Sequence, residues 1–248
     1  MVRDRRARPV AAQGMGAVLC GLVACAPVAA AGALRDTRAR VRLVVTASAA
    51  SSTYRNPVCA RDFPDPNVLK VGPDYYVYGA TTGWEPAGHL FPILILRVCD
   101  LAHWRYVGDA FARAPGWGSG DWWAPVVVAH KNASDMYYVG KNASGTHCVA
   151  VALAVRPQGP YVHRRVVGCG DAKEIGYIDP APLLDADGKA YLYVSVDNPF
   201  DSPSPDISAL PLAPDLVRQD GPRRALFLVS QDWEHGAGYT TVEGVLAD

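Results

Sequence analysis

Short runs of β-branched, aromatic and other apolar residues recur along the chain after about residue 65, and each run is bounded by Gly, Pro, Asp or Asn. Apolar runs of this length between turn residues are typical of strands rather than helices. Many short strands separated by turns favour a sandwich, a barrel or a propeller. The clearest runs predict strands at 75–78, 93–96, 136–139, 149–153 and 191–194.

A weak internal repeat separates these architectures. Asp65-Pro66, Ala124-Pro125 and Asp179-Pro180 each precede a short apolar strand, a turn and an aromatic strand, and their prolines stand 59 and 55 residues apart. Each unit offers two further strands, the last of them near 105–107, 161–163 and 225–228. Four strands per unit at this period are the pattern of propeller blades. A sandwich does not need a matching opening in every unit, so the sequence predicts an all-β propeller.

Acidic residues stand at the openings of three units. Asp65 and Asp179 immediately precede their prolines, and Glu243 occupies nearly the same point in a fourth unit that begins at 241–246. The first strand of a propeller blade is the innermost, so equivalent openings converge on the mouth of the central channel. Three carboxylates held close together shift one another's pKa, so one can act as an acid while another stays ionised as a base. Glycosidic bond cleavage requires this division of roles.

The stretch 62–69, DFPDPNVL, places two aspartates in front of the first predicted strand. Asp and Pro are also ordinary turn residues, so the Asp-Pro pairs have a purely structural alternative. Proline pushes the preceding residue towards extended geometry, and Asp65 is therefore expected in β or polyproline conformation. Because the later units repeat Asp65 as their opening, Asp62 is left as the turn residue.

Composition narrows the possible partners. The 248 residues are half hydrophobic and can bury a sizeable core, in one large domain or two small ones. The 24 basic and 24 acidic residues cancel, so charge does not indicate a nucleic-acid partner. The chain has no CxxC pair, and its histidines lack the spacing of metal ligands or of a nucleophile triad. We expect no metal and no cofactor.

The N-terminus has the pattern of an export signal. Arginines at positions 3, 5, 6 and 8 precede an apolar run over 15–34 that contains a small-residue cleavage region at 29–33. Pro27 disfavours a membrane span, and no membrane contact is expected once the signal is removed. A lipid anchor through Cys25 is the alternative. The predicted boundaries are a signal peptide at 1–32, a flexible lead-in at 33–54 and the propeller domain at 55–248.

Cysteine usage agrees with export. Removal of the signal leaves four cysteines, which allow three disulfide pairings: Cys59, Cys99, Cys148 and Cys169. Asn132 and Asn142 each begin a glycosylation sequon, which is used only in a secreted protein of a eukaryotic host.

Six groups of residues occur in the order of a known family: DFPDPNVL at 62–69, DLAHW at 100–104, WWAP at 122–125, GPY at 159–161, IDP at 178–180 and VEG at 242–244. Together they resemble glycoside hydrolase family 43 over most of the chain after Arg55. The resemblance implies a five-bladed propeller with β-xylosidase, α-arabinofuranosidase or endo-arabinanase activity. The implied substrates are arabinan, arabinoxylan or xylo-oligosaccharides.

The resemblance also implies roles for individual residues. Asp65 becomes the general base that activates water, Asp179 the pKa modulator that orients the acid, and Glu243 the general acid. The family inverts anomeric configuration, which places base and acid roughly 6.5 to 9.5 Å apart. Trp123 is expected to offer its ring to a sugar, with a core position between blades as the alternative.

Two departures from the family pattern support a second hypothesis. Val245 stands where family members usually have proline, and the chain stops at Asp248 after three units and the start of a fourth. We therefore expect the N-terminal part of a longer propeller. The alternative function is a non-catalytic carbohydrate-binding propeller or an inactive remnant.

Overall fold

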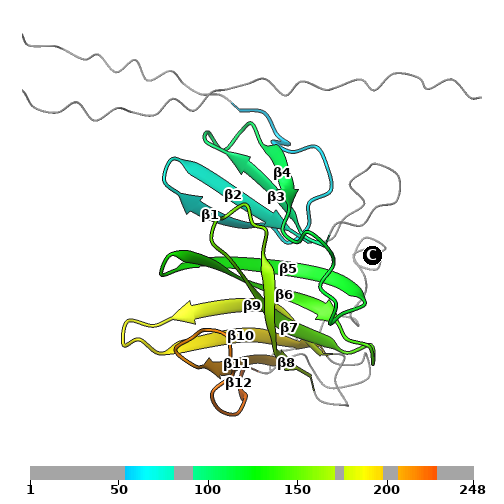
Figure 1. The fold of residues 1–248 in the computed structure, drawn as a ribbon, viewed down its shortest axis with the longest axis vertical. Coiled ribbons are helices and arrows are strands. Elements are labelled where there is room, and N and C mark those ends of the chain that lie inside the picture. Colours follow the sequence, from blue (N-terminus) through cyan, green and yellow to red (C-terminus); the bar gives the residue numbers. More distant parts are fainter. Residues whose placement is uncertain (1–53, 81–91, 171–175, 198–205, 228–248) are drawn as a thin grey trace, which may run out of the picture. The chain divides into compact units, whose positions relative to one another are not determined.

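The computed structural model describes residues 54–80, 92–170, 176–197 and 206–227 (Figure 1). These ranges contain twelve strands, and no helix within them is long and apolar enough to cross a membrane. The predictions for the signal peptide, the lead-in up to residue 53 and the unit that contains Glu243 lie outside the described residues. The same holds for Val245 and Cys25.

The strands form three successive four-stranded antiparallel meanders, here called blades 1, 2 and 3. Blade 1 contains β1 (Asn67–Val71), β2 (Asp74–Gly79), β3 (Leu94–Val98) and β4 (Arg105–Asp109). Blade 2 contains β5 (Gly120–His130), β6 (Ala133–Lys141), β7 (His147–Ala154) and β8 (Val162–Cys169). Blade 3 contains β9 (Gly176–Leu184), β10 (Ala190–Asp197), β11 (Asp206–Leu212) and β12 (Arg224–Phe227).

The first strands of neighbouring blades contact each other, β1 with β5 and β5 with β9. One parallel residue pair, His147 with Gly176, also joins the sheets of blades 2 and 3. The predicted four-strand unit is therefore confirmed, and the openings of the blades gather as a propeller requires. The described residues form three blades of the predicted five-bladed propeller.

The sheet of blade 2 buries both of its faces, which explains the continuous apolar runs in its strands. On β6, Met136 and Tyr138 point to blade 1, whereas Tyr137 and Val139, which alternate with them, point to blade 3. Side chains alternate across a strand, so a sheet between two neighbours needs apolar residues at every position. Burial of each such side chain contributes about 1.5–3 kcal/mol.

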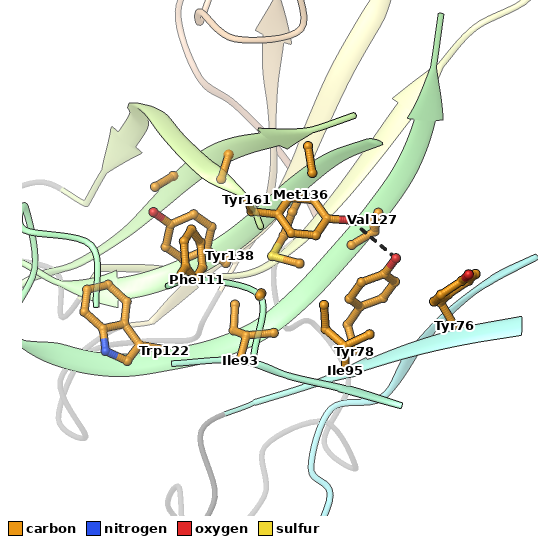
Figure 2. Close-up of a cluster of buried hydrophobic side chains, with 14 residues drawn as sticks. Tyr76, Tyr78, Ile93, Ile95, Phe111, Trp122, Val127, Met136, Tyr138 and Tyr161 are labelled. Carbon is orange, nitrogen blue, oxygen red and sulfur yellow. Dashed lines mark hydrogen bonds between the residues drawn. The ribbon is translucent and has the colours of Figure 1, made fainter. Parts of the chain in front are cut away.

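Figure 2 shows the core between blades 1 and 2. Ile93 and Ile95 of blade 1 lie against Met136 of blade 2, with aromatic rings on either side. The buried aromatic residues of this core are Tyr76, Tyr78, Phe111, Trp122, Tyr138 and Tyr161.

The GPY motif ties blade 2 to blade 1. The Tyr161 backbone N–H donates to Ala110 O at 2.7 Å, and its hydroxyl donates to Pro157 O at 3.1 Å. Tyr78 of blade 1 also donates to Pro157 O, at 2.8 Å. Burial raises the pKa of Tyr161 to about 12. Burial also raises the pKa of Tyr78, and both phenols are protonated and able to donate at neutral pH.

None of the three predicted pairings of the four cysteines is complete in the structure, because Cys59 is unpaired. Cys148 and Cys169 face each other across β7 and β8 and are bonded, whereas Cys59 is a free thiol. The crosslink closes a loop of 21 residues, which restricts the unfolded chain.

We expect the double substitution Cys148→Ala/Cys169→Ala to lower the free energy of unfolding by about 3 kcal/mol, because it removes this restriction on the unfolded chain. Urea unfolding followed by tryptophan fluorescence measures the difference. Cys59→Ser is the matched control and should leave the midpoint unchanged. Equal midpoints for the double variant and the wild type would show that the crosslink does not stabilise the fold.

Candidate active site

Each blade opens on the same backbone irregularity. On β9, Asp179 and Pro180 together stand opposite the single residue Val194, because the register shifts there. On β5, Ala124 and Pro125 stand opposite Tyr138 in the same way. Two residues opposite one are a β-bulge, which re-aims side chains and is common beside active sites.

Blade 1 has the equivalent arrangement at the start of β1. Asn67 pairs with Tyr78, and the Ala80 N–H donates to Pro64 O at 3.0 Å, so Asp65 and Pro66 share one partner position. The repeat seen in the sequence is therefore a repeated bulge as well as a repeated strand order.

The residue before each proline has a positive φ: 50° at Asp65, 42° at Ala124 and 52° at Asp179. The prediction of β or polyproline geometry for Asp65 is therefore wrong. The preference of a residue before proline for extended geometry is overridden here by the bulge, since one class of bulge places its first residue in the left-handed region. Such conformations cost on the order of 1–3 kcal/mol and persist where the surrounding structure holds them in place.

The stretch 62–69 is fastened to both blades around it. The Phe63 ring lies over Gly79, so close that an added Cβ would be 2.6 Å from it. The Asn67 carboxamide oxygen accepts a 2.9 Å hydrogen bond from the Val127 N–H of blade 2. Asp65 therefore lies in the sequence between two anchored residues, Phe63 and Asn67.

The three openings line one cleft of about 170 Å³, formed by Asp65, Pro66, Asn67, Ala124, Pro125, Val126, Asp179 and Pro180. Both aspartates are exposed to solvent, whereas Ala124 at the same position of blade 2 is buried. Asp62 does not line this cleft. The structure therefore brings together two of the three predicted acids, and the third, Glu243, lies outside the described residues.

The two neighbouring tryptophans of the WWAP motif have opposite environments. Trp122 is 5% exposed and belongs to the core, whereas Trp123 is 37% exposed. A second bulge on β5, with Asp121 and Trp122 opposite Gly140, accompanies this separation. Trp123 is therefore not the core residue of the alternative interpretation, although it does not line the cleft between Asp65 and Asp179.

A polar cluster beside Trp123 was missed by sequence reasoning. The Asp121 carboxylate lies 2.5 Å from Lys141 Nζ and 3.0 Å from His147 Nε2. Burial alone raises the pKa of Asp121, but its hydrogen bonds to Lys141 and His147 outweigh burial and lower the pKa overall. Spacing along the chain could not reveal this cluster, because its members come from three strands. No group of potential ligands for a metal ion occurs among the described residues.

Residues 54–245 match the family model of the glycosyl hydrolases family 43. The chain belongs to this family, as the six motifs suggested. It is 31% identical over 160 residues to the non-reducing end α-L-arabinofuranosidase BoGH43B of Bacteroides ovatus. This match covers 61% of this chain and 27% of that protein. It is 28% identical over 149 residues to a xylosidase/arabinosidase of Butyrivibrio fibrisolvens, covering 58% and 27%.

Solved structures show the same likeness. A thermostable family-43 glycoside hydrolase superposes with a TM-score of 0.63 at 27% identity and covers 74% of this chain and 59% of its own. An endo-arabinase from Bacteroides thetaiotaomicron superposes with a TM-score of 0.58 at 22% identity, covering 71% and 60%. The chain therefore spans about a quarter of the curated relatives and about 60% of these solved chains.

We expect Asn67→Ala to destabilise the protein by roughly 1–3 kcal/mol, because it leaves the buried Val127 N–H without its acceptor. Asn67→Asp keeps an oxygen at the same place and should restore most of the loss. Thermal and urea unfolding of the two variants measure the difference. Equal destabilisation by both substitutions would contradict the role assigned to the acceptor.

Proposed function

We propose that the protein is an inverting glycosidase that hydrolyses O-glycosidic bonds in arabinose- or xylose-containing polysaccharides or oligosaccharides. The observation that carries the proposal is the meeting of Asp65 and Asp179 in one cleft, each on the bulge that opens its blade. Membership of glycosyl hydrolases family 43 supports the same reaction class.

In the proposed reaction Asp65 is the general base. Its carboxylate takes a proton from water, and the oxygen of that water forms the new bond to the anomeric carbon. The bond from this carbon to the leaving oxygen breaks, and Glu243 as general acid gives the leaving oxygen a proton. Attack from the face opposite the leaving group inverts the anomeric configuration.

Asp179 has the role of modulator in this scheme. A carboxylate close to the general acid disfavours loss of the acid's proton, which keeps the acid able to donate. The backbone of Asp179 is held by the same kind of bulge as that of Asp65, each in its own blade. This shared device supports a fixed placement of both groups before a sugar arrives.

The substrate class is supported by the names of the relatives. The matched proteins include an α-L-arabinofuranosidase and a xylosidase/arabinosidase, and a solved neighbour is an endo-arabinase. These names agree on pentose-containing glycans and differ in linkage and in exo or endo action. We propose the shared class, arabinan, arabinoxylan or xylo-oligosaccharide, as the substrate.

Export completes the proposal. The Arg-rich, apolar N-terminus supports a signal peptide, and the disulfide between Cys148 and Cys169 is typical of proteins made in an oxidising compartment. Lipid anchoring through Cys25 is the alternative. Asn132 and Asn142 lie in the turns at the two ends of β6, where a eukaryotic host could glycosylate them.

We expect Asp65→Ala in the full-length protein to lower kcat roughly 100- to 10,000-fold on aryl α-arabinofuranosides or aryl β-xylosides, because general base catalysis contributes about that factor. Release of the coloured phenol measures the rate. Proton NMR of the sugar first released shows whether its anomeric configuration is inverted. Asp62→Ala, three residues away and outside the cleft, is the matched control and should keep the wild-type rate.

A wild-type rate for Asp65→Ala would show that Asp65 is not the general base. Binding of xylo- or arabino-oligosaccharides by the wild type without any hydrolysis would support the non-catalytic carbohydrate-binding propeller instead.

A further inference from the structure

The half-exposed ring of Trp123 rests on a buried ring. Its centroid lies 4.7 Å from that of His147, with an angle of 38° between the ring planes. The His147 side chain is only 6% exposed. One face of the tryptophan is therefore supported from below, while 37% of the residue stays open to solvent.

His147 is itself fixed by polar contacts. Its Nε2 lies 3.0 Å from an Asp121 carboxylate oxygen, and Lys141 Nζ contacts the same oxygen at 2.5 Å. Asp121 has a φ of 55° at the second bulge of β5, two residues before Trp123. The conformation that directs Asp121 to His147 thus belongs to the backbone segment that turns Trp123 outwards.

The backbone of His147 also holds the strand that carries Asp179. His147 pairs with Gly176 of β9, and a Cβ added at Gly176 would lie 2.1 Å from His147 O. Only glycine permits this approach, and Gly176 stands three residues before Asp179. His147 is therefore in contact both with Trp123 and with the strand that enters the cleft.

We propose that His147, held by Asp121, is a positioning residue that fixes the Trp123 ring as a stacking platform for a sugar of the substrate. The proposal rests on the proposed function, because it assigns the ring to the same glycan. A sugar presents an apolar face to an aromatic ring, and the ring must have one orientation to receive it. A group that is misplaced by about 1 Å can lose a large share of its effect, so a support behind the ring adds affinity without touching substrate.

Ordinary core packing is the competing explanation of the contact between these rings. In that case His147 contributes to stability alone, and its loss affects glycan binding independently of Trp123. Positioning instead predicts that the loss acts only through Trp123. A double-mutant cycle separates the two, because residues that act through each other have non-additive effects.

The test uses the full-length protein with the additional substitution Asp65→Ala, so that oligosaccharides bind without being hydrolysed. Dissociation constants for xylotetraose and arabinotetraose are measured by calorimetry. We expect His147→Ala to raise the dissociation constant about tenfold and Trp123→Ala at least as much. In the Trp123→Ala background, His147→Ala should then add less than twofold.

A second substitution at the same position guards against misfolding. His147→Phe keeps a flat ring under Trp123 and loses the contact with Asp121, so we expect an intermediate rise in the dissociation constant. Thermal unfolding of every variant shows which of them are folded. Failure of His147→Ala to fold leaves the cycle to be run with His147→Phe, under the same criterion.

His130 provides a matched control on the same hairpin of β5 and β6. Its Nδ1 lies 3.0 Å from Asp135 Oδ2, so it is also a histidine paired with a carboxylate, but its contact is at the other end of these strands. His130→Ala should lower stability and leave the dissociation constant unchanged. A change as large as that of His147→Ala would show that general loosening of blade 2 causes the effect.

The outcomes distinguish the positioning role from the proposed function. Tight binding with fully additive effects of His147→Ala and Trp123→Ala overturns the positioning role and leaves the glycosidase proposal intact. Binding of neither oligosaccharide by the parent protein overturns the substrate class, and the positioning role with it.

Discussion

Packing of blade on blade is the constraint on which the rest of the structure depends. A four-stranded meander has two apolar faces to bury, and blade 2 buries them against blades 1 and 3. In this packing the first strands of neighbouring blades contact each other, β1 with β5 and β5 with β9. The cleft exists because this packing brings three chain openings, far apart in sequence, to one place.

Within that arrangement the same kind of backbone bulge occurs three times, and two of the three bulges carry an aspartate. Asp65, Ala124 and Asp179 share a positive φ before proline, so the bulge belongs to the fold and not to the reaction. Ala124 shows that the backbone does not need a carboxylate to adopt it. The fold therefore does not require the two aspartates, which line the cleft at positions that the bulge sets.

The sequence was informative where a physical property repeats along the chain. Strands such as β6 are buried on both faces and therefore stand out in the sequence as continuous apolar runs. The repeated Asp-Pro pair singled out Asp65 and Asp179. It was silent where the property depends on contacts between strands: the positive φ of Asp65, and the pair of Asp121 with His147. The outward position of Trp123 and the inward one of Trp122 depend on two successive bulges, which a period of two does not predict.

The exposure of Asp65 and Asp179 bears on how the proposed site acts. Water around two carboxylates reduces their repulsion, which is why an open cleft can keep both at little cost. A bound sugar displaces that water and strengthens every electrostatic interaction that remains. These include the interaction between carboxylates that separates the pKa of the acid from that of the base. A fixed platform at Trp123 favours the same step, since it places the sugar before the water has left. Binding and acid–base chemistry are then coupled through the displaced water. In this scheme the contact of His147 with Trp123 acts on the binding step.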